Sequence, residues 1–537
     1  MPIWNRKDIR IPEWKAKWWI FRRKLCTQRI LIVTDTTGSF DPGSNTGLTE
    51  LIDVLEGNGD VPAAVPAVIT KVSKANGFAF ASASPAVTTK NYDQIWLFGF
   101  GSGPASTNAD EIRVIAKFMQ TGGGVFATGD HSDIGRPLCG ALPRIRKMRE
   151  WSAVPMSGPT RIDTVNHPGV DGIARNSDQS DQFPQSIYPV PDASSAPHSL
   201  LRSSAGTINN LPDHPHESEC YAPRGSALAG NFSVSDMADF PEFPPVAGSP
   251  FGPELVAISM SASLNQDKGA VTPRCFGAIS AYNGHLANVG RVVCDSTWHH
   301  FVNMNLNSSN PYDDIGLHEG SPPVANAAYK QIQRYYANIA DYLTPKNRKW
   351  CRLFDVVATE IFDYPILEEI ITLPPIPPRF PDIPDWPRAV EIGKLVRSSL
   401  ENKYGKGAFS SLIDDIFDVA DMDENTMLQF NAGLHGFSQQ NLKKKTKQFD
   451  DPEALMEIKL GMVGNIVTTM KQQLPNNPDE FVNEAEKLIS SGKEIISAVT
   501  TSSLHEGITH RLLSYQENLK HLSLFEKEMV SNRSSAA

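Results

Sequence analysis

The segment Gly122-Gly-Gly-Val-Phe-Ala-Thr-Gly-Asp130-His131 decides the fold prediction for this chain of 537 residues. Residues 125–128 have the short apolar composition of a buried strand, and glycines stand on both sides of them. The preceding residues, Asn108 to Thr121, carry apolar side chains at helical spacing. A helix followed by a buried strand and then by an acidic turn is typical of a parallel α/β sheet.

Other segments repeat this alternation of strands and helices. Buried strands are predicted at Arg29–Asp35, Tyr92–Gly99, 254–259, Phe276–Tyr282 and Gly290–Asp295, with helices near Leu48–Leu55 and Ala327–Leu343. We therefore expect an α/β domain with a flavodoxin-like parallel sheet and helices on both faces. Ligands of such sheets gather beyond the carboxyl ends of the strands. Asp35, Asp130 and Asp295 each end a predicted strand and would lie at that edge.

Composition changes along the chain predict its domain organisation. Residues 1–27 form a basic, Trp-rich arm, and residues 28–350 form the α/β domain. Within that domain, residues 152–254 are rich in Pro, Ser, Asp and Gly, which favours an irregular, pocket-building insertion over another sheet layer. Residues 351–388 form a proline-rich connector, and residues 389–537 have apolar positions at helical spacing. The last region is predicted to be a helical domain.

Charge and cysteine content narrow the classes of function. A net charge of -10 argues against nucleic acid as the partner of the surface as a whole. The six cysteines form no CxxC pair, so neither a zinc knuckle nor a dense disulfide framework is indicated. No apolar run approaches the roughly 18 residues of a membrane span, and the first residues lack a signal peptide's apolar stretch. A cytoplasmic location is the expectation from these features.

The arm of residues 1–27 interleaves tryptophans with cations. Its members are Trp4, Trp14, Trp18 and Trp19 among Arg6, Lys7, Arg10, Lys15, Lys17, Arg22, Arg23 and Lys24. Such a segment suits an anionic membrane surface or a protein partner. The structural alternative is that the indole rings cover the sheet edge while the cations remain solvated.

Three clusters of acids and histidines carry the predicted chemistry. They are Asp130-His131, Asp213-His-Pro-His216-Glu217 and Asp295-Ser-Thr-Trp-His299-His300. We predict catalytic roles for Asp130, His131 and Glu217 because a carboxylate or imidazole can act as nucleophile or base. The predicted ligands of a divalent metal (Zn, Mn, Fe or Mg) are Asp35, His214, His216, Asp295, His299 and His300.

Two further groups have both a structural and a functional interpretation. In an extended segment, His299 and His300 would point in opposite directions, so only one would face the site. The alternative is that both bind backbone carbonyl groups below the insertion. Arg144, Arg146 and Arg149 form a basic edge near the Asp130 turn. They would recognise an anionic substrate or pair with local acids.

One part of the chain resembles the class I glutamine amidotransferases and their ThuA-like relatives. It consists of the strand Tyr92–Gly99, the helix ending in Phe118 and the segment Gly122-Gly-Gly-Val-Phe. The strand at Gly290-Arg-Val-Val and the helix at Asn338-Ile-Ala-Asp-Tyr-Leu are similar to the closing elements of that fold. The resemblance covers roughly residues 28–345 and implies a nucleophile at about Asp130. The family's glutaminases have a cysteine there, whereas the nearest cysteine in this chain is Cys139.

A second resemblance starts from Asp35-Thr-Thr37-Gly-Ser39. This pentapeptide is similar to the metal-ion-dependent adhesion site of von Willebrand factor A domains, in which acid and hydroxyl groups hold Mg²⁺. Thr107 and Asp130 would supply the later loops of such a site. An aspartate followed by small hydroxyl residues after a strand is also ordinary turn chemistry.

Two functions follow from these patterns. The first is a hydrolase-like enzyme with an acid/His site, metal-dependent or metal-free, acting on a small-molecule or peptide substrate. The second is a noncatalytic binding or assembly protein, including an adhesion-type module that binds its ligand through a metal.

Overall fold

The computed structural model describes residues 27–151 apart from 45, 60–66, 105 and 131–132. It further describes 165–168, 174–177, 185–191, 197–212, 219–260, 275–307, 317–350 apart from 322–323, 386–420, 452–473, 494–510 and scattered positions at 353–356 and 513–523. The chain divides into two compact units. One unit contains Arg22–Lys349 and Tyr404–Gly407, and the other contains the remaining residues. The predicted N-terminal arm and most of the proline-rich connector lie outside the described residues.

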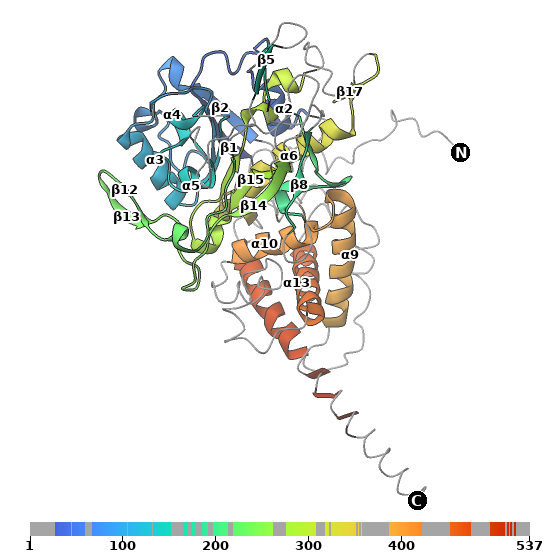
Figure 1. The fold of residues 1–537 in the computed structure, drawn as a ribbon. Helices are drawn as coiled ribbons and strands as arrows, with labels where there is room; N and C mark the ends of the chain where they lie inside the picture. Colours follow the sequence, from blue (N-terminus) through green and yellow to red (C-terminus); the bar gives the residue numbers. More distant parts are fainter. Residues whose placement is uncertain are drawn as a thin grey trace, which may run out of the picture. The chain divides into compact units, whose positions relative to one another are not determined.

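An eight-stranded sheet forms the centre of the first unit (Figure 1). In spatial order its strands are β2 (Ala67–Ser73), β1 (Gln28–Thr34), β3 (Gln94–Phe98), β4 (Gly124–Thr128), β16 (Val292–Asp295), β15 (Cys275–Tyr282), β14 (Glu254–Met260) and β8 (Tyr188–Pro189). The first five strands in this spatial order, β2, β1, β3, β4 and β16, run parallel to one another. The α/β class predicted from the sequence is confirmed.

The rest of the sheet is antiparallel, so the prediction of a wholly parallel sheet is wrong for this part. Strand β15 pairs antiparallel with both β14 and β16, and β8 pairs antiparallel with β14. A parallel pair needs a crossover of about a dozen residues or more, usually with a helix. Residues 283–291, which join β15 to β16, are too few for this and contain only a short 3-10 helix.

The insertion contributes more regular structure than its composition predicts. Strand β8 extends the main sheet, and the remaining short strands form two-stranded pairs. These pairs are β5 (Val165–Pro168) with β6 (Ala174–Ser177), β7 (Gln185–Ser186) with β11 (Asn210–Leu211), β9 (Arg202–Ser203) with β10 (Gly206–Thr207), and β12 (Asn231–Val234) with β13 (Met237–Pro241). After the insertion, β17 (His318–Glu319) pairs with β18 (Val324–Ala325). Strands this short carry little periodic signal, which is why sequence patterns missed them.

Helices cover the parallel half of the sheet. Helices α2 (Thr49–Glu56) and α6 (Ala327–Leu343) share one apolar core with alternate residues of the sheet strands, such as Ile30, Ile32 and Val293. That core includes no residue of helix α3 (Ala109–Gln120) or of the short helices α4 (Arg136–Cys139) and α5 (Ile145–Met148).

Helix α3 begins where the sequence predicts. The Asn108 side chain accepts a hydrogen bond from the Glu111 backbone, and the Glu111 carboxylate accepts one from the Asn108 backbone. This reciprocal capping satisfies two backbone donors that a helix start leaves unpaired. Lys74 pairs with the same carboxylate at 2.6 Å and connects α3 to the segment after β2.

The second unit contains the helices α9 (Trp386–Tyr404, of which all but Tyr404 belong to this unit), α10 (Ala408–Ala420) and α13 (Pro452–Gln473). Residues 494–510 are also helical. Helix α10 buries Leu412, Ile413, Ile416 and Phe417. Among the described residues, no helix combines the length and apolarity that crossing a membrane requires.

Candidate acid/histidine site

The carboxyl ends of the parallel strands bring the predicted acids to one edge of the sheet. Thr34, Phe98, Thr128 and Asp295 are register partners across β1, β3, β4 and β16. Asp35 directly follows β1, Asp130 lies two residues beyond β4, and Asp295 is the last residue of β16. The other predicted site residues, His131, His214, His216 and Glu217, lie outside the described residues.

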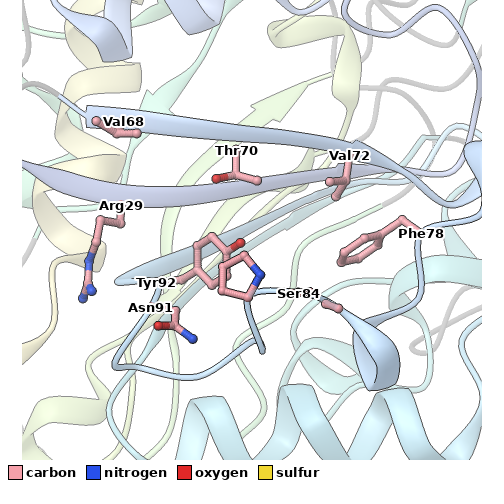
Figure 2. A pocket seen from close by; sticks show the side chains of 10 residues that line it. Arg29, Val68, Thr70, Val72, Phe78, Ser84, Asn91 and Tyr92 are labelled. Atoms are coloured by element: carbon pink, nitrogen blue, oxygen red, sulfur yellow. The ribbon is translucent and has the colours of Figure 1, made fainter.

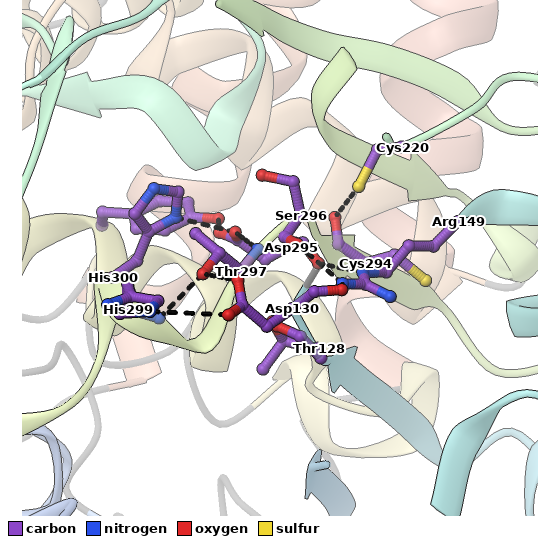
Figure 3. Close-up of polar contacts among 12 residues, drawn as sticks. Thr128, Asp130, Arg149, Cys220, Cys294, Asp295, Ser296, Thr297, His299 and His300 are labelled. Atoms are coloured by element: carbon purple, nitrogen blue, oxygen red, sulfur yellow. Dashed lines mark hydrogen bonds and ion pairs between the residues drawn. The ribbon is translucent and has the colours of Figure 1, made fainter. Parts of the chain in front are cut away.

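Asp130 and His299 form the more accessible pair of the site (Figure 3). The Oδ2 atom of Asp130 lies 3.5 Å from Nε2 of His299, and its Oδ1 atom accepts a 2.9 Å hydrogen bond from the Thr297 hydroxyl. The Asp130 side chain is only 1% exposed, whereas that of His299 is 15% exposed. A buried carboxylate therefore faces an imidazole ring that solvent reaches.

The other side of His299 is also fixed. The side-chain amide nitrogen of Asn305 donates to the His299 carbonyl at 2.8 Å and lies 3.3 Å from Nδ1 of its ring. Because an amide nitrogen only donates, Nδ1 accepts, and the neutral ring carries its proton on Nε2, toward Asp130. The ring stacks on Trp298 with centroids 4.0 Å apart. Trp298 in turn packs against Phe100.

Asp295 and His300 form a second pair, which is fully buried. Oδ1 of Asp295 lies 2.7 Å from Nδ1 of His300 and also accepts a bond from the Thr297 amide, while Oδ2 accepts a 2.7 Å bond from the Tyr335 hydroxyl. The hydroxyl of Tyr336 donates to the His300 carbonyl. Burial raises the pKa of Tyr335 well above its usual value, and the charge of Asp295 adds to this effect. Tyr335 therefore remains a hydrogen-bond donor at neutral pH.

The two histidines thus have different partners, although they are adjacent. The expectation of an extended segment is wrong, because Trp298–His300 forms a 3-10 helix, η7, whose start is capped by Thr297. The rings of His299 and His300 nevertheless point in different directions. His299 faces Asp130 and His300 faces Asp295 (Figure 3).

Arg149 connects the turn after β4 to the end of β16 through hydrogen bonds to backbone carbonyl groups. Its buried guanidinium donates to the carbonyl oxygens of Asp130, Glu150, Asp295 and Ser296 at 2.7–3.0 Å. Its guanidinium carbon also lies over the Trp151 ring, 4.3 Å from the ring centroid. Burial lowers the pKa of this guanidinium. Since these carbonyl groups occupy its donors, Arg149 fixes the geometry of the turn after β4 relative to the end of β16.

Asp35 lies at the same edge but contacts the backbone. Its carboxylate accepts hydrogen bonds from the amides of Phe100, at 2.7 Å, and of Gly101, at 3.1 and 3.2 Å. Burial raises the pKa of Asp35, and these amide bonds oppose the rise. In the described residues Asp35 therefore holds the loop after β3 against β1.

The metal prediction rests partly on residues that the structure does not describe. Within the described part of the chain, no three His, Cys, Asp or Glu side chains gather as a metal-binding group. Asp295 and His300 face each other, and Asp130 faces His299. The clustering of these residues with His214 and His216 stays a prediction.

Three of the described cysteines lack the character of a nucleophile, whereas Cys275 is exposed. Cys139, Cys220 and Cys294 are buried, and burial raises the pKa of each thiol above its usual value. A thiol of this kind stays protonated at neutral pH, and only the thiolate attacks. Any chemistry at this edge of the sheet falls to the acids and histidines.

A hollow of about 340 Å³ lies elsewhere on the sheet, along the edge strand β2 (Figure 2). Alternate residues of β2, Val68, Thr70 and Val72, line it together with Tyr92. Arg29 also borders it, and its guanidinium is paired with Asp93 at 2.6 Å. The hollow contains none of the acids and histidines predicted for the site.

Three residues that shape the site were not predicted from the sequence. Thr297 bonds to both acids, Asn305 fixes the His299 tautomer, and Tyr335 binds Asp295 from α6. Thr297 lies inside a predicted cluster and was available as a signal. The other two reach the site only through folding and carry no local sequence signal.

Comparison of the chain with protein-family models, curated proteins and solved structures gave no match.

The basic edge beside this site predicts a pH dependence of stability. Burial acts to raise the pKa of Glu242, but donation from the Arg146 side chain and the Arg144 amide outweighs it, so the pKa lies below its ordinary value of 4.5. A lowered folded-state pKa contributes stability above the unfolded value, and this is lost as pH falls through the folded value. We expect the melting temperature of the wild type to exceed that of Glu242→Gln at about pH 7 and the difference to shrink below about pH 4. A difference independent of pH would contradict this assignment.

Proposed function

We propose that this chain is a hydrolase-like enzyme in which His299 is the general base and Asp130 is the residue that positions it. The observation that carries the proposal is the buried Asp130 carboxylate, 3.5 Å from the Nε2 atom of the partly exposed His299 ring. Such a pair recurs in enzymes because the carboxylate fixes the tautomer and stabilises the imidazolium that forms. Its place beyond the carboxyl ends of parallel strands is where ligands of α/β sheets bind.

The proposed step uses the Nδ1 atom of His299. In this step a water molecule displaces the 3.3 Å contact between the Asn305 amide and Nδ1. Nδ1 then takes a proton from the water while the water oxygen bonds to the electrophilic atom of a small-molecule or peptide substrate. Nε2 keeps its proton and faces Asp130, so that the positive charge of the imidazolium is balanced by the carboxylate. The imidazolium then returns a proton to the leaving group, which restores the neutral ring.

The fold assignment that we propose is an amidotransferase-like, flavodoxin-like domain followed by a helical domain. The order β2-β1-β3-β4 in the parallel half of the sheet supports the first part. The described helices α9, α10 and α13 support the second. In this assignment Asp130 occupies the turn where the glutaminases of the family carry a cysteine, which agrees with a water molecule rather than a side chain as the nucleophile.

Catalysis is tested with chromogenic carboxyl esters, phosphate esters and amides. On any substrate that the wild type hydrolyses, we expect His299→Gln and Asp130→Asn to lower kcat by roughly 10²- to 10⁴-fold. Asp41→Asn is the matched control, because this exposed acid precedes the same domain's first helix and should leave kcat unchanged. The rate should also rise with pH as His299 loses its proton, and His299→Gln should abolish this rise.

The same assay separates the proposal from its alternatives. It is run with chelator and with added Zn²⁺, Mn²⁺ or Mg²⁺, and a requirement for a metal would move the proton-transfer role from His299 to a metal-bound water. Full activity in both variants would overturn the proposal. Absence of hydrolysis across the three substrate classes would instead favour the noncatalytic binding protein.

A further inference from the structure

The guanidinium of Arg144 is buried without a hydrogen-bond partner. The residue is 0% exposed, and its Nε, Nη1 and Nη2 atoms bind no acceptor in the described part of the chain. Burial lowers its pKa, and the attraction of Tyr282 and Glu242 opposes this only in part. A buried charge is costly unless it is paired and hydrogen-bonded. The observed surroundings of Arg144 leave most of that pairing unfilled.

Tyr282 places a second unfilled donor beside Arg144. Its ring lies 5.6 Å from the guanidinium carbon, and Arg144 is the residue that influences its hydroxyl electrostatically. In the described part of the chain, no acceptor lies within hydrogen-bond geometry of this buried hydroxyl. Burial raises the pKa of Tyr282 to about 12, so the hydroxyl keeps its proton at neutral pH. The rings of Phe243 and Phe251 pack against Tyr282 and hold it in place. Two donor groups thus lie beside each other, next to the rings of Phe243 and Phe251.

The backbone at Arg144 is strained in support of this arrangement. Its φ angle is 66°, in a region that residues with a side chain rarely adopt. The Arg144 amide donates to Glu242 at 2.8 Å and so helps to hold the turn. Backbone strain of this kind persists where the surroundings enforce it, and it clusters at functional sites.

The local charge is positive. Arg146 and Lys147 share the single carboxylate of Glu242, at 2.8 and 3.3 Å, and Arg144 adds a third cation. Arg149 is committed to backbone carbonyl groups, and the next acid along the chain, Glu150, lies 3.4 Å from the Tyr221 hydroxyl. Among the described residues of this cluster, the one carboxylate of Glu242 thus faces three cations, and a further anion would balance the charge.

We propose that Arg144 and Tyr282 bind a small inorganic oxyanion of the phosphate or sulfate type. The guanidinium offers planar paired donors that match two oxygens of such an ion, and Tyr282 offers a third bond. The enclosure of both groups favours an ion over a larger anionic molecule. The site is separate from the acid/histidine pairs, because Tyr282 is opposite Val292, at the start of β16, whereas Asp295 ends that strand.

The first test is whether the ion is retained. The full chain is purified in chloride buffer, then denatured, and the released anions are measured by ion chromatography. We expect about one equivalent of phosphate or sulfate from the wild type and none from Arg144→Met. Lys90→Met is the control, since it removes an exposed cation outside this cluster and should keep the ion.

The second test measures binding to chain that has been dialysed free of oxyanions. Phosphate, sulfate and acetate are each added at constant ionic strength, with chloride as the reference, and the melting temperature is followed. We expect a saturable rise with phosphate or sulfate, no rise in Arg144→Met, and about tenfold weaker binding in Tyr282→Phe. Tyr282→Phe keeps the test decisive if Arg144→Met does not fold.

Two results would overturn the proposal. One is a wild type that releases no oxyanion and gains no stability from phosphate or sulfate beyond that given by chloride. The other is an equal response in the wild type and Tyr282→Phe. A response to acetate alone would reassign the site to a carboxylate ligand and would refute the tetrahedral oxyanion.

Discussion

Replacing Asp295 with Ala is expected to lower the free energy of unfolding by about 3–5 kcal/mol, as measured by urea denaturation of the full chain. The carboxylate accepts from the His300 ring, the Tyr335 hydroxyl and the Thr297 amide, all within the buried interior. Removing the acceptor leaves these donors buried and unpaired, which costs more than the bonds themselves contribute. The substitution also opens a cavity at the end of β16.

Two further variants serve as comparisons for Asp295→Ala. Asp41→Ala removes an exposed acid of the same domain and should change the free energy of unfolding by no more than about 0.5 kcal/mol. Asp295→Asn keeps the shape and one acceptor oxygen, so its loss should be smaller than that of Asp295→Ala. An Asp295→Ala protein as stable as the Asp41→Ala protein would contradict the role assigned to this carboxylate.

Replacing Asp295 should also lower the catalytic efficiency of His299, although Asp295 does not touch the His299 ring. The Thr297 amide is held by Asp295, and the Thr297 hydroxyl joins Asp130 to the start of the turn that carries His299. Under the proposed function, Asp295 is therefore a positioning residue. Its Asn variant should keep the rise of rate with pH while lowering kcat, whereas His299→Gln loses that rise.

The sequence could predict the parallel half of this fold because its signals are local. Buried strands such as Arg29–Asp35 appear as continuous apolar runs that end in an acid. The pair Asn108 and Glu111, three residues apart, predicts the start of α3. Parallel pairing then places the acids at one edge without further information. The positions of Asp35, Asp130 and Asp295 at that edge agree with this reasoning.

The other parts of the fold and of the site depend on tertiary structure, which the sequence patterns do not reveal. Strand β2 is buried only at its two ends and contains Lys71 and Ser73, so it lacks the continuous apolar run of the central strands. Strand β8 is only two residues long and gives no periodic signal. The pairing of each histidine depended on a 3-10 turn rather than an extended segment. The contributions of Tyr335 and Asn305 came from the packing of distant segments, which no spacing in the sequence encodes.

Replacing Gly290 with Ala is expected to destabilise the protein by about 3 kcal/mol or more, because the new methyl group has no room. A Cβ atom at this position would lie 1.9 Å from the carbonyl oxygen of Gly123 and 3.2 Å from that of Met119. Both obstacles are backbone atoms, so no side-chain rotation relieves the contact. Gly290 also donates its amide to Met119 at 2.7 Å, which fixes the end of α3 against the start of β16.

The matched control is Gly43→Ala, where a Cβ atom would meet nothing within 4 Å and the backbone is not in the left-handed region. That substitution should leave the free energy of unfolding unchanged or raise it by about 0.4–1 kcal/mol, since it restricts only the unfolded chain. Urea denaturation of both variants measures the difference. Equal stability would mean that β4 and β16 do not approach as closely as the Gly123–Gly290 contact requires. Because the same two strands place Asp130 and His299 at the site, loss of this contact should also lower any hydrolytic activity.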